Sequence, residues 1–345
     1  MNNNPYTLTF GKEPPQMIQR FAQSSEILET FSDDSPSQQI YMVTGVRGSG
    51  KTVFMTSIAR KLEEDSWIVV ELNSSGEILK ELAAKLYNTK GLSRIFDDAG
   101  IDLSFFGISV NIKKNNPITD LGTAVELMLS KLSKRHKRVL ITIDEVSNTK
   151  EMQYFAGAFQ ILVRHELPVF LLMTGLYENI NKLQNEENLT FLYRAPKLYL
   201  GALNIGRIAD SYEKLLGLSR EDALSLAKMS KGYPLAFQVL GYFSCNKGGD
   251  YMAALPDARQ YLAEYVYEKI WLELSRIEKD LLTCIALRKQ IEVKAVKAAM
   301  DLPANEFSVY RDRLIKKGLL DGSTRGVLRL TLPFFDDYVN EHADL

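Results

Sequence analysis

The chain has 345 residues, of which 46% are hydrophobic, so it is long enough for two or three domains with ordinary packed cores. Its 42 lysine and arginine residues balance 43 aspartate and glutamate residues, for a formal net charge of −1. This balance excludes a global positive field that would attract nucleic acid or anionic lipid, so any contact with DNA must be local. Two cysteines and three histidines are too few for a disulfide framework or a cysteine-based zinc site.

The N-terminal residues and the hydropathy pattern indicate a cytoplasmic protein. Residues 1–5 are polar and lack the apolar centre of a signal peptide. No apolar run approaches the ~18 residues that a membrane-spanning helix needs. We therefore expect neither secretion nor a membrane span, and the low cysteine content fits a reducing compartment.

A glycine-rich motif follows the first predicted strand. Residues 17–31 have apolar positions at helical spacing, residues 33–37 form a polar break, and residues 40–43 form the strand. Residues 45–52, GVRGSGKT, then fit the pattern G-x-x-x-x-G-K-[ST], and residues 53–62 have helical spacing again. A strand, this loop and a helix in that order predict a phosphate-binding P-loop.

The residue types of this loop suit a nucleoside triphosphate, and we expect ATP and Mg²⁺ as cofactors. Glycines let the backbone turn so that successive N–H groups point inward, and the following helix adds the positive end of its dipole. Lys51 is placed to reach the β- and γ-phosphates, and Thr52 to ligate Mg²⁺. Arg47 is expected to face solvent or to pair with a carboxylate. The candidate binding residues are Gly45, Arg47, Gly48, Ser49, Gly50, Lys51, Thr52 and Val53.

Strands and helices continue to alternate up to about residue 200. Further strands are predicted at residues 67–72, 138–143, 169–173 and 197–200, and helices at residues 78–86, 121–132 and 152–163. This alternation predicts an α/β three-layer sandwich of the P-loop NTPase type, whose parallel sheet is covered on both faces and binds ligands beyond the carboxyl ends of its strands. Residues 101–113 alternate apolar and polar positions around Gly107, which predicts a hairpin inserted outside this sheet.

Two carboxylates directly follow the strand at residues 138–143. Asp144 is placed to hold Mg²⁺ together with Thr52, and Glu145 to polarise the attacking water, so both are candidate catalytic residues. The alternative is a strand that ends in a solvated acidic turn. No Asn-Lys-x-Asp run follows the third or fourth strand, which favours adenine over guanine.

Two residues near later strand ends are further candidates for the reaction. Thr174 directly follows the fourth predicted strand, and we expect its hydroxyl to point toward the γ-phosphate or, alternatively, to bond the backbone. Arg194 precedes the fifth strand and is expected to neutralise charge in the transition state, in its own or a neighbouring subunit. An ion-paired surface arginine would give the same pattern.

The pattern becomes all-helical at residues 205–244, which predicts a small helical lid. Gly217 and residues 231–234 interrupt it, and Pro234 opens a helix at a position where a missing N–H costs nothing. Residues 246–250 are polar and rich in glycine, which is typical of a joint between domains.

The C-terminal region combines helices with a hairpin. Helices are predicted at residues 258–286, 293–300 and 305–317, followed by a turn at residues 321–323 and an alternating stretch at residues 327–332. This order predicts a winged helix-turn-helix whose recognition helix is residues 305–317. Candidate DNA contacts are Arg311, Arg313, Lys316, Lys317, Arg325 and Arg329.

The charge of this region argues for weak DNA binding. Acidic and basic residues balance from Tyr265 to the C-terminus, and sequence-independent affinity needs unbalanced positive charge unless the charges segregate by face. The alternative is a module for packing or protein contact. The predicted domains are an ATPase core at residues 1–202 with an N-terminal segment at 1–37, a lid at residues 203–250 and a winged helix at residues 251–345.

Taken together, these motifs resemble those of a known family over nearly the whole chain. The chain is similar to P-loop ATPases of the AAA+/STAND group, in particular archaeal-type ATPases and bacterial relatives of origin-recognition ATPases. The residues that carry the resemblance include Arg20, the P-loop, Asp144-Glu145, Thr174-Gly175, residues 190–195, Gly232-Tyr233-Pro234, Gln238, Gly241 and residues 310–318.

The resemblance implies roles for several of these residues. Lys51 and Thr52 would serve the phosphates and magnesium, the acidic pair the metal and water, and Pro234 would contact the nucleotide from the lid. Related AAA+ proteins carry a lid arginine as a second sensor, whereas this chain has a Gly-Tyr-Pro turn with Lys231 as the nearest cation. This difference favours a slow switch over fast, ring-coupled turnover.

Three functions follow from these expectations. The first is ATP binding with slow Mg²⁺-dependent hydrolysis that drives a conformational switch. The second is an ATP-regulated DNA-binding regulator or loader that uses the winged helix. The third is a nucleotide-gated scaffold with little turnover that binds another protein or a second copy of itself.

Overall fold

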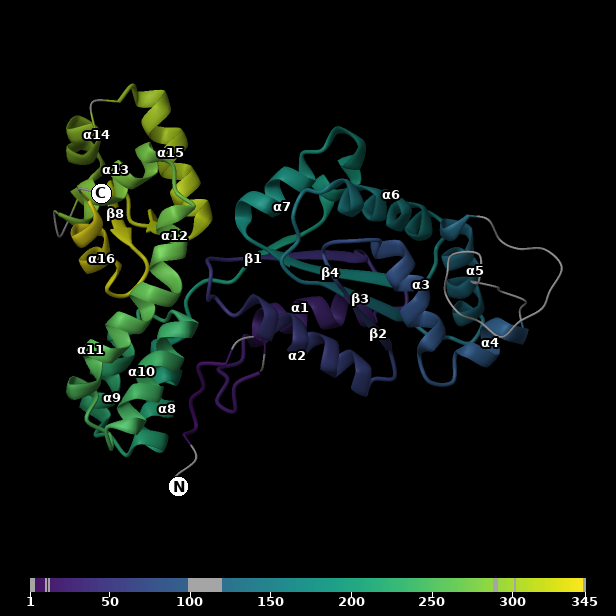
Figure 1. Ribbon diagram of the computed structural model, residues 1–345, viewed down its shortest axis with the longest axis horizontal. Coiled ribbons are helices and arrows are strands. Elements are labelled where there is room, and N and C mark those ends of the chain that lie inside the picture. Colours follow the sequence, from purple (N-terminus) through teal and green to yellow (C-terminus); the bar gives the residue numbers. More distant parts are fainter. Residues whose placement is uncertain are drawn as a thin grey trace. The chain divides into compact units, whose positions relative to one another are not determined.

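The computed structural model describes residues 4–9, 11, 13–98, 120–287, 291–300 and 302–343 (Figure 1). They form two compact units. The sheet unit consists of Phe21–Thr44 and Lys51–Tyr199, and the helical unit of Met1–Arg20, Gly45–Gly50 and Leu200–Leu345. The hairpin expected at residues 101–113 lies outside the described residues. Within the described ranges, no helix is both long enough and apolar enough to cross a membrane.

The sheet unit contains a five-stranded parallel sheet in the order β2-β3-β4-β1-β5. Its strands are β1 (Ile40–Thr44), β2 (Ile68–Leu72), β3 (Val139–Ile143), β4 (Val169–Gly175) and β5 (Lys197–Tyr199). Every residue of β1, β3 and β4 is buried, which is why these strands read as continuous apolar runs rather than alternating ones. Val43 pairs with Thr174 and Ile143 with Met173, so β1, β3 and β4 end at the same edge of the sheet.

Helices cover both faces of this sheet. They are α1 (Phe21–Ser32), α2 (Lys51–Glu64), α3 (Ile78–Asn88), α4 (Ser93–Asp98), α5 (Leu121–Ser133), α6 (Lys150–Arg164), α7 (Tyr177–Gln184) and a 3₁₀ segment (Glu187–Arg194). Helices α1 and α2 lie on one face, and α6 and α7 on the other (Figure 1). Side-chain caps fix where two of them begin, because Asp120 accepts a hydrogen bond from the Thr123 N–H at α5 and Thr149 one from the Met152 N–H at α6.

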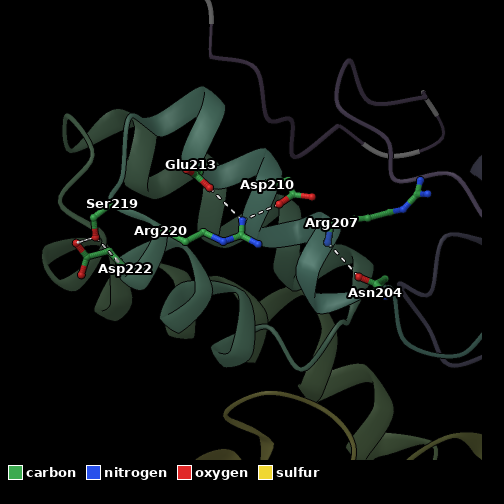
Figure 2. Close-up of polar contacts among 7 residues, drawn as sticks. All are labelled: Asn204, Arg207, Asp210, Glu213, Ser219, Arg220 and Asp222. Carbon is green, nitrogen blue, oxygen red and sulfur yellow. Dashed lines mark hydrogen bonds and ion pairs between the residues drawn. The ribbon is translucent and has the colours of Figure 1, made fainter.

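The first half of the helical unit is a set of packed helices. They are α8 (Ile205–Leu216), α9 (Arg220–Met229), α10 (Pro234–Asn246), α11 (Tyr251–Leu262), a π-helical turn (Ala263–Tyr267) and α12 (Glu268–Leu272). Asn204 caps α8 by accepting from the Arg207 N–H, and Ser219 caps α9 by accepting from the Asp222 N–H (Figure 2). Arg220 ties the two helices together through ion pairs with Asp210 at 2.6 Å and Glu213 at 3.0 Å.

The N-terminal segment packs on α10 of the same unit. The buried ring of Tyr6 makes an edge-to-face contact with Phe237, with 5.5 Å between ring centroids. Gln238 holds the segment at two points, accepting from the Thr7 N–H at 3.2 Å and donating to the Gln16 carbonyl at 2.7 Å. These contacts explain why the first 20 residues group with the helical unit.

The C-terminal part of the helical unit surrounds a small antiparallel sheet in the order β6-β8-β7. Its elements are α13 (Arg276–Ala286), β6 (Ile291–Glu292), α14 (Val293–Met300), α15 (Ala304–Lys317), β7 (Leu320–Asp321), β8 (Val327–Leu330) and α16 (Phe335–His342). The helices and hairpin expected at residues 293–332 are present, whereas β6 and α16 were not predicted.

A buried ion pair joins α15 to the start of α13. The ammonium of Lys317 lies 2.8 Å from Oε1 of Glu278, whose side chain is only 2% exposed. The other oxygen, Oε2, accepts from the backbone N–H of Ser275 at 2.8 Å and from its hydroxyl at 2.9 Å. Burial raises the pKa of Glu278, but the hydrogen bonds from Lys317 and Ser275 outweigh it, so this pKa lies below its ordinary value.

We expect Lys317→Met to lower the free energy of unfolding by about 3 kcal/mol at pH 7, because it leaves the Glu278 carboxylate buried without its partner. A lowered pKa stabilises the folded state above the ordinary carboxyl pKa of about 4.3, and this stabilisation is lost as the pH falls through the folded-state pKa. The difference between wild type and variant should therefore shrink in acid. Urea unfolding at pH 7 and at pH 4 measures it.

Lys269→Met is the matched control, because Lys269 is exposed and lies 3.9 Å from Glu273. It should cost well under 1 kcal/mol at either pH. Equal losses in the two variants, or a loss in Lys317→Met that grows in acid, would contradict the assigned role of the buried pair.

Candidate functional site

The loop between β1 and α2 is tightly turned. Gly48 and Gly50 have φ angles of +76° and +83°, in the left-handed region that glycine adopts without strain. The N–H of Ser49 donates to the Val46 carbonyl at 3.1 Å. A Cβ atom on Gly45 would lie 2.4 Å from the Ser49 hydroxyl oxygen, so the first glycine of the motif is needed for close packing.

The two residues after the loop begin α2 in the sheet unit. Lys51 is 9% exposed, which is rare for a lysine, and Val53 is half-buried in the first turn. The hydroxyl of Thr52 donates to Oδ2 of Asp144 at 2.5 Å. The structure thus brings together the hydroxyl and the carboxylate that the sequence assigned to Mg²⁺, although they are 92 positions apart in the chain.

The end of β3 is tied to the end of β4. Asp144 Oδ1 accepts a hydrogen bond from the Thr174 hydroxyl and another from the Glu145 N–H at 3.0 Å. The Glu145 N–H also lies 3.3 Å from the Thr174 hydroxyl, and the Val146 N–H donates to the Thr174 carbonyl at 2.9 Å. The carboxylate of Asp144 is therefore held by donors from three places, Thr52, Thr174 and its own chain neighbour.

Glu145 has an unusual backbone conformation. Its φ angle is +51°, which is uncommon for a residue with a side chain and occurs often at functional sites. The hydrogen bonds of its N–H fix this conformation, while its side chain is exposed. The turn therefore points one carboxylate into a hydrogen-bond network and leaves the other accessible.

Hydroxyl and carboxylate oxygens are the ligands that Mg²⁺ prefers. Thr52 and Asp144 supply one of each, and Thr174 adds a second hydroxyl against the same carboxylate. These residues fit a magnesium ion held at the carboxyl ends of the strands. The expected direction of the Thr174 hydroxyl toward a γ-phosphate stays a prediction.

Arg194 ends the 3₁₀ segment and is exposed. Among the residues that the structure describes, no ion pair involves it, so the alternative of a paired surface arginine has no support there. Its role toward the transition state stays a prediction.

The turn before α10 contacts the P-loop within the helical unit. The hydroxyl of Tyr233 donates to the Arg47 carbonyl at 2.6 Å, and Cβ of Pro234 lies 3.9 Å from where a Cβ on Gly50 would be. The guanidinium of Arg47 forms an ion pair with Glu273 at 2.9 Å, which is one of the two alternatives that the sequence predicted. Pro234 thus lies beside the P-loop, and the nucleotide contact expected of it stays a prediction.

At least three of the six candidate DNA contacts are engaged within the chain. Lys317 is held by Glu278, Arg311 pairs with Asp312 at 2.8 Å, and the guanidinium of Arg313 lies over the Tyr310 ring, 5.4 Å from its centroid. Lys316, Arg325 and Arg329 are exposed. The internal pairing of Lys317 counts against a phosphate contact by this residue.

Sequence reasoning missed three residues that contact the P-loop backbone or its side chains. They are Tyr233, Glu273 and Arg20, whose guanidinium donates to the carbonyls of Ser49 at 3.3 Å and Gly201 at 2.7 Å. Tyr233 and Arg20 belong to motifs that carried the resemblance. The resemblance implied that residues 18–20 border the adenine, which stays a prediction, but it did not indicate the contacts of Arg20 with the loop carbonyl or those of Tyr233. Glu273 gave no signal.

Two family models match the chain. Residues 25–191 match an ATPase domain predominantly from Archaea, and residues 264–339 match a domain of unknown function. None of the curated proteins compared matches the sequence. The family match supports the predicted resemblance to archaeal-type ATPases over the sheet unit.

Solved structures give the fold of the whole chain. The Walker-type ATPase of Pyrococcus abyssi is similar with a TM-score of 0.63 at 13% sequence identity, and the match covers 94% of this chain and 96% of that one. Cdc6p from Pyrobaculum aerophilum matches with a TM-score of 0.48 at 12% identity, covering 97% of each chain. The second TM-score is below 0.5, so we draw no conclusion from that likeness. At 13% identity the first likeness shows the fold alone. The predicted fold class, an α/β P-loop ATPase with a parallel sheet and a helical C-terminal region, is confirmed.

Proposed function

We propose that this protein binds ATP with Mg²⁺, hydrolyses it slowly and uses the nucleotide state to switch the conformation of its helical unit. The single observation that carries this proposal is the 2.5 Å hydrogen bond from Thr52 to Asp144, directly after a P-loop and a buried Lys51. The match of residues 25–191 to an ATPase domain supports it.

The phosphate groups would bind the loop amides and Lys51. A triphosphate at the N-terminus of α2 is favoured by the helix dipole and by N–H groups that have no partner within the helix. Mg²⁺ would be held by Thr52 and Asp144 and would supply charge neutralisation on the phosphate oxygens. Glu145, exposed beside this carboxylate, is placed to orient the attacking water.

We infer slow turnover from the position of Lys231, the cation nearest to the lid turn in the sequence. Lys231 was the one cation that sequence reasoning found in place of a second-sensor arginine. Its ammonium donates instead to the carbonyls of Leu330 and Leu332, at 3.2 Å and 2.9 Å. Burial lowers the pKa of Lys231, against the opposing effect of Asp336 and Asp337. With this ammonium engaged in holding the chain, we infer that Lys231 supplies no additional positive charge to the transition state.

The same turn supports the switch. Residues 231–234 contact the P-loop through Tyr233 and the end of β8 through Lys231. Residues 231–234 would therefore transmit a change of loop conformation on nucleotide binding to the C-terminal elements. We keep the division into a lid at residues 203–250 and a C-terminal domain at residues 251–345 as part of this proposal.

Calorimetric titration with Mg·ATP and single-turnover hydrolysis of labelled ATP test the proposed function. We expect saturable binding to one site and release of phosphate that needs Mg²⁺. A flat titration would overturn the proposal, and binding without hydrolysis would leave the nucleotide-gated scaffold in its place.

We infer that the C-terminal elements form a winged helix that serves as a module for packing or protein contact. The order α13, β6, α14, α15, β7 and β8 is that of a winged helix-turn-helix. Because Lys317 and Arg311 are paired within the chain, we infer that α15 does not read DNA. Salt-sensitive gel shifts of duplex DNA that are lost on double substitution of Arg311 and Arg313 by alanine, both on α15, would contradict this inference and favour the DNA-binding regulator.

A further inference from the structure

We propose that Tyr233 and Arg20 are positioning residues that aim the amide groups of the P-loop at the phosphates. This inference rests on the proposed function, because it assumes that the loop binds a phosphate chain. It assigns a purpose to two long-range hydrogen bonds that end on loop carbonyls rather than on side chains.

The geometry of the peptide group links each carbonyl to the N–H of the next residue. In a trans peptide the carbonyl of one residue and the N–H of the next point in opposite directions. Holding the Arg47 carbonyl on one side therefore directs the N–H of Gly48 to the other side. The described part of the chain has no cis peptide bonds, so this relation applies throughout the loop.

Tyr233 holds the first of these peptide groups. Its hydroxyl donates to the Arg47 carbonyl at 2.6 Å, the short end of the range for such a bond. The side chain is almost fully buried, and burial raises the pKa of Tyr233 well above its usual range, so the hydroxyl stays a donor. The Tyr233 backbone is itself fixed, because its N–H donates to the Ser230 carbonyl at 2.8 Å.

The contact is tight enough to require glycine opposite it. A Cβ atom on Gly48 would lie 2.2 Å from the Tyr233 hydroxyl oxygen, closer than any real contact. Gly48 also has a positive φ angle. The central glycine of the motif thus lets the loop approach the tyrosine while its N–H faces the other way.

Arg20 acts on the second peptide group. Its guanidinium donates to the Ser49 carbonyl at 3.3 Å, which directs the N–H of Gly50 to the opposite side. The same guanidinium nitrogen lies 2.7 Å from the Gly201 carbonyl, and this shorter bond anchors it. Because the bond to Ser49 is longer, we expect Arg20 to contribute less than Tyr233.

Fixing these two amides before the ligand arrives reduces the cost of binding. When a flexible loop becomes ordered on binding, the loss of conformational entropy reduces the affinity. Donors that are already in position do not incur this loss. The effect should be confined to ligands that carry phosphates. It should therefore appear with inorganic pyrophosphate as well as with Mg·ADP.

Tyr233→Phe tests this proposal, with Tyr212→Phe as the matched control. Both tyrosines are buried in the helical unit and donate to a backbone carbonyl, Tyr212 to Phe237 at 2.8 Å, but Tyr212 does not contact the loop. We expect Tyr233→Phe to weaken the binding of Mg·ADP and of pyrophosphate about five- to ten-fold, the net value of one hydrogen bond. Tyr212→Phe should bind both as wild type does. Calorimetry gives the dissociation constants, and thermal unfolding of the ligand-free proteins shows whether the two variants lose similar stability.

The outcomes separate this inference from the proposed function. If wild type binds neither ligand, the proposed function fails. If wild type binds both and Tyr233→Phe binds them as tightly as Tyr212→Phe, the positioning role is wrong. Should Tyr233→Phe fail to fold, Arg20→Gln decides, with a two- to three-fold loss of pyrophosphate affinity supporting the proposal and an unchanged affinity overturning it.

Discussion

A Lys51→Ala protein is expected to bind Mg·ATP at least about 100-fold more weakly than wild type. Charge-assisted hydrogen bonds to phosphate are about twice as strong as neutral ones, and a lysine in this position would contact two phosphate groups. Lys51 is also only 9% exposed, so most of the removal of its side chain from water takes place on folding and does not oppose ligand binding. Calorimetric titration with Mg·ATP measures the loss.

Lys61→Ala is the control for this change, because Lys61 lies in the last turn of the same helix. It removes the same charge from α2 at the end remote from the loop and should leave the affinity within a factor of two. Wild-type affinity in Lys51→Ala would mean that nucleotide binds elsewhere or that the loop amides suffice without the ammonium.

Local sequence patterns predicted the five strands of the sheet unit, whereas the short helices α4 and α7 were not predicted. The runs at residues 40–43 and 138–143 correspond to β1 and β3, whose residues are all buried, and burial on both faces is what makes such runs apolar throughout. Helix α14 has the bounds that its spacing predicted. Strong periodicity and full burial leave few alternatives for such segments.

Weaker or composite signals were misinterpreted. Residues 258–286 were expected to form one helix, whereas the structure has a π-helical turn at Ala263–Tyr267 and a new helix from Arg276. The new start carries a capping box between Ser275 and Glu278, a signature that is readable in the sequence but hidden within continuous apolar spacing. Helix α16 was not predicted, although Asp336 and Asp337 lie in its first turn, where the helix dipole favours acidic residues.

The sequence predicted those residues of the candidate site that lie in contiguous motifs. The P-loop and the acidic pair are contiguous motifs, and strand order brings their neighbours together. By contrast, the hydrogen bond from Tyr233 to Arg47 spans 186 positions and the ion pair from Arg47 to Glu273 spans 226. Local sequence patterns do not identify the partners in such pairings, because these depend on how separate elements fold into one unit.

Glu145→Gln is expected to keep nucleotide binding and to lose at least about 100-fold in the rate of hydrolysis. Glutamine has the same size but cannot accept a proton from water, and general bases contribute about 10²- to 10⁴-fold. The hydrogen bonds that fix the turn come from the backbone N–H of this residue, so the substitution leaves them in place. Because the side chain is exposed, its replacement should not change the free energy of unfolding measurably. Single-turnover hydrolysis of labelled ATP, run beside a binding titration, measures both quantities.

A matched change on the neighbouring helix tests whether the effect belongs to this carboxylate. Glu151 is exposed in the first turn of α6, and Glu151→Gln removes the same charge with the same change of side chain. It should hydrolyse ATP at the wild-type rate. Normal phosphate release from Glu145→Gln would assign the water to another group, and an equal loss in both variants would mean that the general negative charge at this edge of the sheet, rather than a positioned base, drives the reaction. A loss in Glu145→Gln alone, with affinity unchanged, identifies the exposed carboxylate of this strained turn as the group that acts on water.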